Sequence, residues 1–315
     1  MDNFFIHFVL CNITIGLFVL ILLCMKRIFK HCLTPRMQFN LWIPFTISLL
    51  VPFLPVSFST LSTKMQDLFH PLAHFSHTVH TTNTSEYTSS STNQIYDYAI
   101  SMRTQFPVYI STIFCVIWGI GMFVMLFSFV RSLVLLHHMR RTANLMQDKR
   151  IHDIYMTCLS ELQLRKSIPL YSSSIIDTPV STGILRPAIF LPLHHISNFE
   201  EQEIRYILLH ELMHCYYKDA IFNYCMNIIR ILYWFHPLIW LITKEFYTER
   251  ELACDTSVLR LLGANEQISY GVTLLHFVDK QTNTPLSLLN NLSENAKQMK
   301  RRILNIKQHQ PLTIQ

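Results

Sequence analysis

Charged residues are scarce in this chain of 315 residues. Asp, Glu, Lys and Arg together make up 15% of the sequence, whereas hydrophobic residues make up 50%. Soluble domains carry about 25% charged residues, so this composition excludes an ordinary soluble protein and favours a membrane protein. Three apolar runs, 4–25, 39–58 and 108–130, contain no Asp, Glu, Lys or Arg. Each is about long enough to cross a hydrocarbon core of roughly 30 Å.

The first run lacks the marks of a cleavable signal peptide. No basic residue precedes it, and no Ala-x-Ala-like site follows it. Lys and Arg are concentrated after the first run, at 26–36, and after the third, at 131–150. The positive-inside rule therefore predicts a multi-pass cell-membrane protein with the amino terminus and loop 59–106 outside. Residues 1–133 would form a membrane region with three transmembrane helices, and residues 134–315 a cytoplasmic domain.

Three further interpretations are not favoured. The eight cysteines include none in loop 59–106, and no two are spaced as Cys-x-x-Cys, which argues against a disulfide framework and against a cysteine-type zinc site. The net charge of +6 comes largely from basic residues that flank the apolar runs. We therefore expect the lipid bilayer as a partner and no direct contact with nucleic acid.

Residues 210–214 form the motif His-Glu-Leu-Met-His. On a helix, His210 and His214 lie one turn apart on the same face, so both imidazoles can bind one metal ion. Glu211 lies between them and can act as general base on a metal-bound water. The alternative is a helix with two solvated histidines, but the apolar helical context favours the metal site.

A downstream acidic motif can complete this site. A catalytic zinc ion takes three protein ligands and keeps one position for water, and Glu251 of the Glu251-x-x-x-Asp255 motif is the predicted third ligand. Asp255, one turn later, can accept a hydrogen bond from a ligating histidine, and Asp219 is a weaker candidate for that role. Cys215 and Cys254 are predicted to be small core residues. We therefore predict one Zn²⁺ per chain.

The group that would stabilise an oxyanion is not identified by the sequence. Four tyrosines near the motifs are candidates: Tyr216, Tyr217, Tyr247 and Tyr270.

Local patterns indicate how these motifs are held. Ser197 and Glu200 have the spacing of a capping box at the start of the metal-binding helix. Stretches 168–172 and 179–192 are typical of short strands, and the prolines of the second favour an edge strand or hairpin. An edge strand beside the metal-binding helix is where an extended substrate would pair in a protease. A small sheet that only covers the core is the alternative.

A fourth apolar run, 220–242, is also long enough to cross a membrane. If it crossed, His214 and Glu251 would be separated by about 34 Å of helix and could not share an ion with bonds of about 2 Å. We therefore predict that the run breaks near His236-Pro237, because proline disrupts helix continuation. Its halves would form a re-entrant helical hairpin.

In combination, these motifs resemble the amino-terminal part of the BlaR/MecR-type beta-lactam sensor-transducers, which are integral-membrane gluzincin metallopeptidases of Gram-positive bacteria. The resemblance covers almost the whole chain. The matching stretches are 183–192, 206–214, 233–238, 251–255 and 300–303.

The resemblance implies a mainly α membrane protein with three transmembrane helices and a cytoplasmic α+β gluzincin domain that contains a small β-sheet. The family's metal ligands correspond to His210, His214 and Glu251, and its catalytic glutamate to Glu211.

The resemblance also implies a role in signalling. In that family, drug acylation of an outer sensor domain activates the cytoplasmic protease, and a repressor of resistance genes is then lost, as a direct or indirect substrate. Members also cleave themselves at a dibasic pair that aligns with Arg301-Arg302. The alternative for this segment is a basic helix that lies against anionic lipid, and the two interpretations are compatible.

The resemblance is incomplete. Full-length receptors continue into a fourth span and an outer penicillin-binding domain, whereas this sequence ends at Gln315 and contains no Ser-x-x-Lys motif. We expect either a truncated receptor or a shorter protease that takes its signal from a separate penicillin-binding sensor. A stand-alone membrane quality-control protease and a non-proteolytic receptor fragment stay open as alternatives, and a homodimer is compatible with each.

Overall fold

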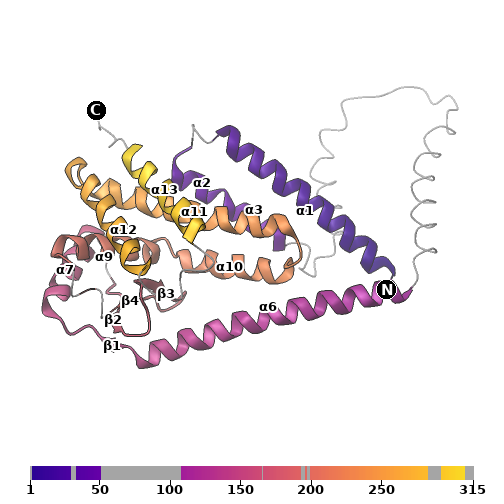
Figure 1. Cartoon of the computed structure of the whole chain (residues 1–315), viewed down its shortest axis with the longest axis horizontal. Helices are drawn as coiled ribbons and strands as arrows, with labels where there is room; N and C mark the ends of the chain where they lie inside the picture. Colours follow the sequence, from indigo (N-terminus) through magenta and orange to yellow (C-terminus); the bar gives the residue numbers. More distant parts are fainter. Residues whose placement is uncertain are drawn as a thin grey trace, which may run out of the picture. The chain divides into compact units, whose positions relative to one another are not determined.

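Helices make up most of the described chain (Figure 1). The computed structural model describes residues 2–29, 33–50, 108–164, 166–192, 196, 199–282 and 292–308. The helices are α1 (Asp2–Phe29), α2 (Pro35–Asn40), α3 (Trp42–Leu50), α6 (Val108–Thr142), α7 (Lys149–Glu161), α9 (Glu201–Tyr216), α10 (Asp219–Leu232), α11 (Pro237–Leu261), α12 (Gln267–Thr282) and α13 (Leu292–Gln308), with a short 3-10 helix, η3 (Ala264–Glu266), before α12.

The chain divides into two compact units, and the His-Glu-x-x-His motif lies in the second. The first contains residues 1–16 and 47–120, and the second contains residues 17–46 and 121–315. The structure therefore groups the segment 17–46 with the carboxyl-terminal part of the chain. The predicted division between residues 133 and 134 stays a prediction.

The third predicted span lies within α6. Thr112–Thr142 is 31 residues long and is the one helical stretch among the described residues that is long and apolar enough to cross a bilayer. Its apolar side chains, for example Phe123 and Phe127, are exposed, and its most apolar part is not buried inside the protein. Exposed apolar surface of this length is what a bilayer-spanning helix presents to lipid.

The first predicted span is helical throughout, and the second is described only in part. Run 4–25 lies within α1, whereas a turn at Leu41 divides run 39–58 between α2 and α3. Residues 51–58 and the predicted outer loop 59–106 lie outside the described residues. The crossing of the membrane by these two runs stays a prediction.

Residues from the amino-terminal helices pack on α11. The rings of Phe39 and Trp42 are buried and contact the ring of Phe246 in α11, with centroids 5.4 and 5.9 Å apart. The Lys26 ammonium and the Trp42 indole N–H both donate hydrogen bonds to the carboxylate of Glu249, also in α11. Lys26 and Glu249 are almost fully buried, so each charge depends on the other because an isolated buried charge is strongly disfavoured.

We expect Lys26→Met to lower the free energy of unfolding by about 3–5 kcal/mol, because it leaves the Glu249 carboxylate buried without its cation. Thermal or chemical unfolding of the purified chain measures this loss. The double variant Lys26→Met/Glu249→Gln removes both charges and keeps an acceptor for Trp42, so it should recover most of the stability. Equal stability of the single variant and the wild type would contradict this account of the contact.

Four short strands form a mixed sheet in the order β1-β2-β4-β3. β1 (Asn144–Leu145) is antiparallel to β2 (Leu170–Ser173), β2 is parallel to β4 (Ala188–Pro192), and β3 (Val180–Thr182) is antiparallel to β4. The predicted strands thus correspond to β2 and to the β3–β4 hairpin. β3 is an edge strand and contacts α9, so an edge strand lies beside the helix that carries the His-Glu-x-x-His motif. β4 lies inside the sheet, and its proline is its last residue.

The predicted capping box of α9 is wrong by one helical turn. The Glu203 carboxylate accepts a hydrogen bond of 3.0 Å from the backbone N–H of Glu200, and Glu200 is the N-cap residue. Ser197 lies outside the described residues. Acidic residues at the first turn are favoured by the positive end of the helix dipole, which suits the glutamates found at this end.

The apolar run 220–242 breaks at the predicted place. α10 ends at Leu232, and α11 begins at Pro237 with His236 as its N-cap. The indole N–H of Trp240 donates a hydrogen bond of 2.7 Å to the Trp234 carbonyl across the turn. α11 then continues to Leu261 and contacts α9, which brings the Glu-x-x-x-Asp motif back to the histidines. The predicted dip of this hairpin into the membrane stays a prediction.

Candidate metal centre

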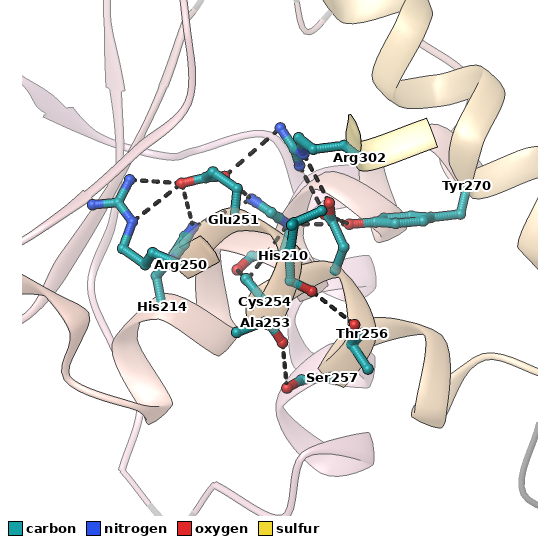
Figure 2. Close-up of polar contacts among 12 residues, drawn as sticks. His210, His214, Arg250, Glu251, Ala253, Cys254, Thr256, Ser257, Tyr270 and Arg302 are labelled. Carbon is teal, nitrogen blue, oxygen red and sulfur yellow. Dashed lines mark hydrogen bonds and ion pairs between the residues drawn. The ribbon is translucent and has the colours of Figure 1, made fainter. Parts of the chain in front are cut away.

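α9 brings the two histidines of the motif together. Its residues Leu208, Leu209 and Leu212 are buried in the core, which holds the helix in place. His210 and His214 lie one turn apart, and their Nε2 atoms are 3.2 Å from each other. Figure 2 shows that both rings lie close to Glu251. The predicted pairing of the two imidazoles is therefore present.

Glu251 reaches the histidines from α11. Its Oε2 lies 3.3 Å from His210 Nε2, and its Oε1 lies 3.7 Å from His214 Nε2. With bonds of about 2.0–2.1 Å, two ligand atoms of a tetrahedral zinc site are about 3.3 Å apart. The two nitrogens are 3.2 Å apart, and each lies 3.3 or 3.7 Å from a different oxygen of Glu251, so the three side chains are close enough to share one zinc ion.

A buried thiol is the alternative third ligand. The potential ligand atoms of His210, His214 and Cys254 lie within 4.8 Å of one another. However, the Cys254 Sγ lies 3.5 Å from His210 Nδ1 and 3.4 Å from its carbonyl oxygen, and Nδ1 is not the ring nitrogen that faces His214. The geometry therefore favours Glu251. Cys254 is fully buried and Cys215 packs against the core, as expected for small core residues.

Asp219 orients His214. Its Oδ2 lies 2.7 Å from His214 Nδ1, and because a carboxylate only accepts hydrogen bonds, Nδ1 is the donor. The lone pair of His214 Nε2 is then available for a metal. The sequence ranks Asp219 below Asp255 for this role, but Asp219 makes the shorter contact, since Asp255 Oδ1 lies 3.4 Å from His210 Nδ1. Each aspartate therefore lies beside the Nδ1 atom of a different histidine.

Asp255 and Tyr270 lie together against His210. The Tyr270 hydroxyl donates a hydrogen bond of 2.7 Å to Asp255 Oδ1 and lies 3.1 Å from His210 Nδ1. Burial and the negative charge of Asp255 raise the pKa of Tyr270 well above its usual range, so the phenol keeps the proton that it donates. Its oxygen can then accept from His210 Nδ1–H, which leaves His210 Nε2 free for a metal.

This use of Tyr270 argues against a role as oxyanion stabiliser. The other tyrosine candidates are placed differently: Tyr216 is exposed, and the Tyr217 ring lies 3.3 Å from the Arg36 guanidinium carbon. None of the four tyrosines is among the described residues that line the cavity beside the histidines. The oxyanion stabiliser is therefore not identified among them.

Two arginines flank Glu251, and the sequence patterns did not identify their part in the site (Figure 2). Arg250 Nη2 lies 2.6 Å from Glu251 Oε1, and Arg302 Nη1 lies 3.7 Å from Glu251 Oε2. Burial alone would raise the pKa of Glu251, but positive charge beside it, above all the Arg250 guanidinium, outweighs burial and holds this pKa well below its usual range. Glu251 is thus a carboxylate at neutral pH, which is the form that binds a metal.

A cavity of about 870 Å³ opens beside the cluster. His210, Glu211, His214 and Glu251 line it, together with the edge strand β3 and the loop that follows it. An extended peptide that pairs with an edge strand gains main-chain hydrogen bonds. The cavity therefore places an edge strand and the predicted general base around the same space.

Gly183 ends β3 in a conformation that favours glycine. Its φ is +105°, and a Cβ at this position would lie 2.4 Å from the Arg186 carbonyl oxygen. The same carbonyl and that of Thr182 accept hydrogen bonds from Arg140 in α6, at 2.5 and 3.3 Å. The hairpin turn is thus tied to the end of α6, and this fixes the position of β3.

We expect Gly183→Ala to lower kcat/KM for peptide cleavage by about 5- to 150-fold, because a strained backbone conformation costs about 1–3 kcal/mol and the turn must shift to relieve it. The zinc content should not change, since Gly183 contacts none of the proposed ligands. Peptide hydrolysis and metal analysis on the same preparation check both statements. Gly263→Ala is a control, because nothing lies within 4 Å of a Cβ there.

The dibasic pair lies in helix α13, and both side chains bind α11. Arg301 makes hydrogen bonds of 2.7 and 2.9 Å to Glu245, and Arg302 makes hydrogen bonds of 2.7 and 2.8 Å to Asp255. Proteases bind substrates in an extended conformation, so cleavage at Arg301-Arg302 would require this part of α13 to unwind. Self-cleavage at this pair stays a prediction.

Comparison with known proteins identifies the family. A family model described as BlaR1 peptidase M56 matches residues 6–306. The chain belongs to the BlaR1 peptidase M56 family. The matched region contains every residue of the candidate metal centre, from His210 to Arg302.

Several relatives in this family align with most of the chain. Regulatory protein BlaR1 of Bacillus licheniformis is 30% identical over 308 residues, which cover 97% of this chain and 51% of that protein. Methicillin resistance mecR1 protein of Staphylococcus aureus is 25% identical over 248 residues, 76% of this chain and 40% of that protein. Regulatory protein BlaR1 of Staphylococcus aureus is 24% identical over 305 residues, 92% and 48% respectively. The chain thus spans about half the length of these relatives.

Proposed function

We propose that this chain is a membrane-embedded zinc endopeptidase with a cytoplasmic active site. The observation that carries the proposal is the convergence of His210 Nε2 and His214 Nε2, 3.2 Å apart, on the Glu251 carboxylate, whose two oxygens lie 3.3 and 3.7 Å from them, in a cavity that Glu211 also lines. Membership of a peptidase family supports the reaction class. The exposed apolar surface of α6, followed by basic residues, supports the membrane location and the cytoplasmic side.

His210, His214 and Glu251 would hold the ion, and Asp219, Asp255 and Tyr270 would orient the imidazoles. When bound, zinc lowers the pKa of a coordinated water and polarises a carbonyl group. Glu211 would accept a proton from the attacking water and deliver it to the nitrogen of the leaving amine. β3 would hold the substrate backbone in an extended form beside these groups.

We further propose that the protease transmits a beta-lactam signal and causes the loss of a repressor of resistance genes, with self-cleavage at Arg301-Arg302. The names of the relatives, a regulatory protein and a methicillin resistance protein, support a role in the antibiotic response. The repressor would be the direct or indirect cytoplasmic substrate. A penicillin-binding sensor would provide the signal.

The test uses the whole chain purified in lipid nanodiscs. We expect one zinc ion per chain in the wild type and almost none in His214→Ala, together with zinc-dependent cleavage of a repressor protein by the wild type. Wild-type protein without stoichiometric metal would overturn the proposal. Cleavage of a misfolded membrane protein but not of the repressor would overturn the signalling role and favour quality control. Amino-terminal sequencing of any self-cleavage product would show whether the cut lies at Arg301-Arg302.

A further inference from the structure

Arg302 connects the last described helix to the metal centre. From α13, its Nε and Nη2 donate hydrogen bonds of 2.8 and 2.7 Å to the two oxygens of Asp255, in a bidentate pair. Its Nη1 lies 3.7 Å from Glu251 Oε2. The Arg302 side chain is 11% exposed and that of Asp255 is fully buried. One guanidinium therefore faces both the proposed ligand carboxylate and the carboxylate that supports His210.

Asp255 connects Arg302 to His210. Asp255 Oδ1, which accepts from Arg302, also accepts from the Tyr270 hydroxyl and lies 3.4 Å from His210 Nδ1. The Tyr270 hydroxyl lies 3.1 Å from the same Nδ1. Arg302, Asp255 and Tyr270 come from α13, α11 and α12. The orientation of His210 thus depends on three helices that meet at one carboxylate.

We propose that Arg302 is a positioning residue of the metal centre. Arg302 fixes Asp255 and Tyr270, and these two residues in turn orient His210. Helix α13 is therefore required for an intact metal centre. The inference rests on the proposed function, since it assumes that His210 and Glu251 bind zinc. It assigns to Arg302 a role within the intact site that differs from a role as a cleavage point.

Two physical reasons support this role. Without Arg302, the buried carboxylate of Asp255 and the largely buried carboxylate of Glu251, on successive turns of α11, would have less positive charge to compensate them, and an unpaired buried charge is strongly disfavoured. Moreover, a planar guanidinium that binds both oxygens of a carboxylate fixes its orientation, which an ammonium cannot do. The position of Asp255 in turn fixes the tautomer and the ring plane of His210.

Arg301 is a matched control in the same helix. It is also an arginine of the dibasic pair and also makes two hydrogen bonds to a carboxylate of α11, that of Glu245. However, this pair is about one-third exposed, with side-chain exposures of 36% and 35%. Neither residue is among the described residues that line the cavity. A general effect of α13 docking would appear in both arginine variants, whereas positioning of His210 depends on Arg302 alone.

The experiment measures metal binding by the full-length chain in nanodiscs, without reference to proteolysis. Zinc affinity is obtained by competition with a chelator, and Co²⁺ substitution reports the ligand geometry through its visible absorption spectrum. We expect Arg302→Gln to weaken zinc binding by about 10- to 100-fold, as loss of a partner that orients a ligand does, and to alter the Co²⁺ spectrum. Arg302→Lys should recover only part of the affinity, and Arg301→Gln should match the wild type.

A double variant tests the proposed route through Asp255. If Arg302 acts by fixing Asp255, Asp255→Asn/Arg302→Gln should bind zinc no more weakly than Asp255→Asn alone, because the two residues act as one unit. Wild-type affinity and spectrum in Arg302→Gln would overturn the inference, as would equal losses in Arg301→Gln and Arg302→Gln. If Arg302→Gln does not fold, Arg302→Lys against Arg301→Lys gives the same comparison. Wild-type protein that binds no metal would overturn the proposed function first, and this inference with it.

Discussion

Glu211→Gln should leave one zinc ion bound per chain and lower the rate of peptide cleavage by about 10²- to 10⁴-fold, the usual contribution of a general base. Glutamine has the shape of glutamate but cannot accept a proton from the attacking water at neutral pH. Because His210, His214 and Glu251 form the converging cluster without Glu211, metal binding should survive the change. Metal analysis and peptide hydrolysis in nanodiscs measure the two effects separately.

Comparison with His214→Ala distinguishes loss of the metal from loss of the general base. His214→Ala should lose both metal and activity, whereas Glu211→Gln should lose activity alone. Full proteolysis by Glu211→Gln would exclude Glu211 as the general base and leave only a structural role for its side chain in the cavity. Loss of zinc from Glu211→Gln would instead place this carboxylate among the ligands.

Glu251→Gln is expected to weaken zinc binding by more than about 100-fold, because loss of a mere hydrogen-bond partner of a ligand already costs about 10- to 100-fold. The variant also leaves Arg250 and Arg302, which flank this position, to repel a dication. Cys254→Ser is the matched control from the same helix, since Cys254 lies within 4.8 Å of both histidines as the alternative ligand.

Cobalt spectroscopy separates the two candidate ligands directly. A cobalt–thiolate bond gives an intense charge-transfer band in the near ultraviolet, whereas a cobalt–carboxylate bond does not. We expect no such band in the wild type and no change in zinc affinity for Cys254→Ser. A thiolate band, together with zinc loss in Cys254→Ser but not in Glu251→Gln, would replace Glu251 by Cys254 as the third ligand.

Local sequence patterns predict the features that depend on a few neighbouring residues. The helical spacing of His210 and His214 predicts two converging imidazoles, and Pro237 predicts the break that returns α11 to α9. Both are present in the structure. The relative importance of Asp219 and Asp255 as hydrogen-bond acceptors of the histidines is predicted less well. Asp219 follows a turn at Lys218, whose backbone is in the left-handed region with φ of +55°. The direction of a chain after such a turn is not visible in spacing alone.

The contacts of Arg250 and Arg302 with the site could not be predicted from the sequence, for two different reasons. Arg250 and Glu251 are adjacent, and adjacent residues of a helix do not face each other, yet the long arginine side chain reaches back to the carboxylate at 2.6 Å. Arg302 is 47 residues from Asp255 in sequence, and only the docking of α13 brings the two together. The dibasic motif itself indicates a cleavage site and does not reveal this contact.

Glu249, Arg250 and Glu251 are successive residues of α11, and each makes different contacts. Glu249 binds Lys26 and Trp42, Arg250 binds Glu251, and Glu251 faces the histidines. A soluble fragment that starts after the third apolar run would lack Lys26, Phe39 and Trp42. It would therefore leave the Glu249 carboxylate without its cation and expose the Phe246 ring, which Phe39 and Trp42 contact. Attempts to produce the catalytic portion by itself for enzymology or crystallisation should retain the segment 17–46, either in the same polypeptide or supplied as a separate chain.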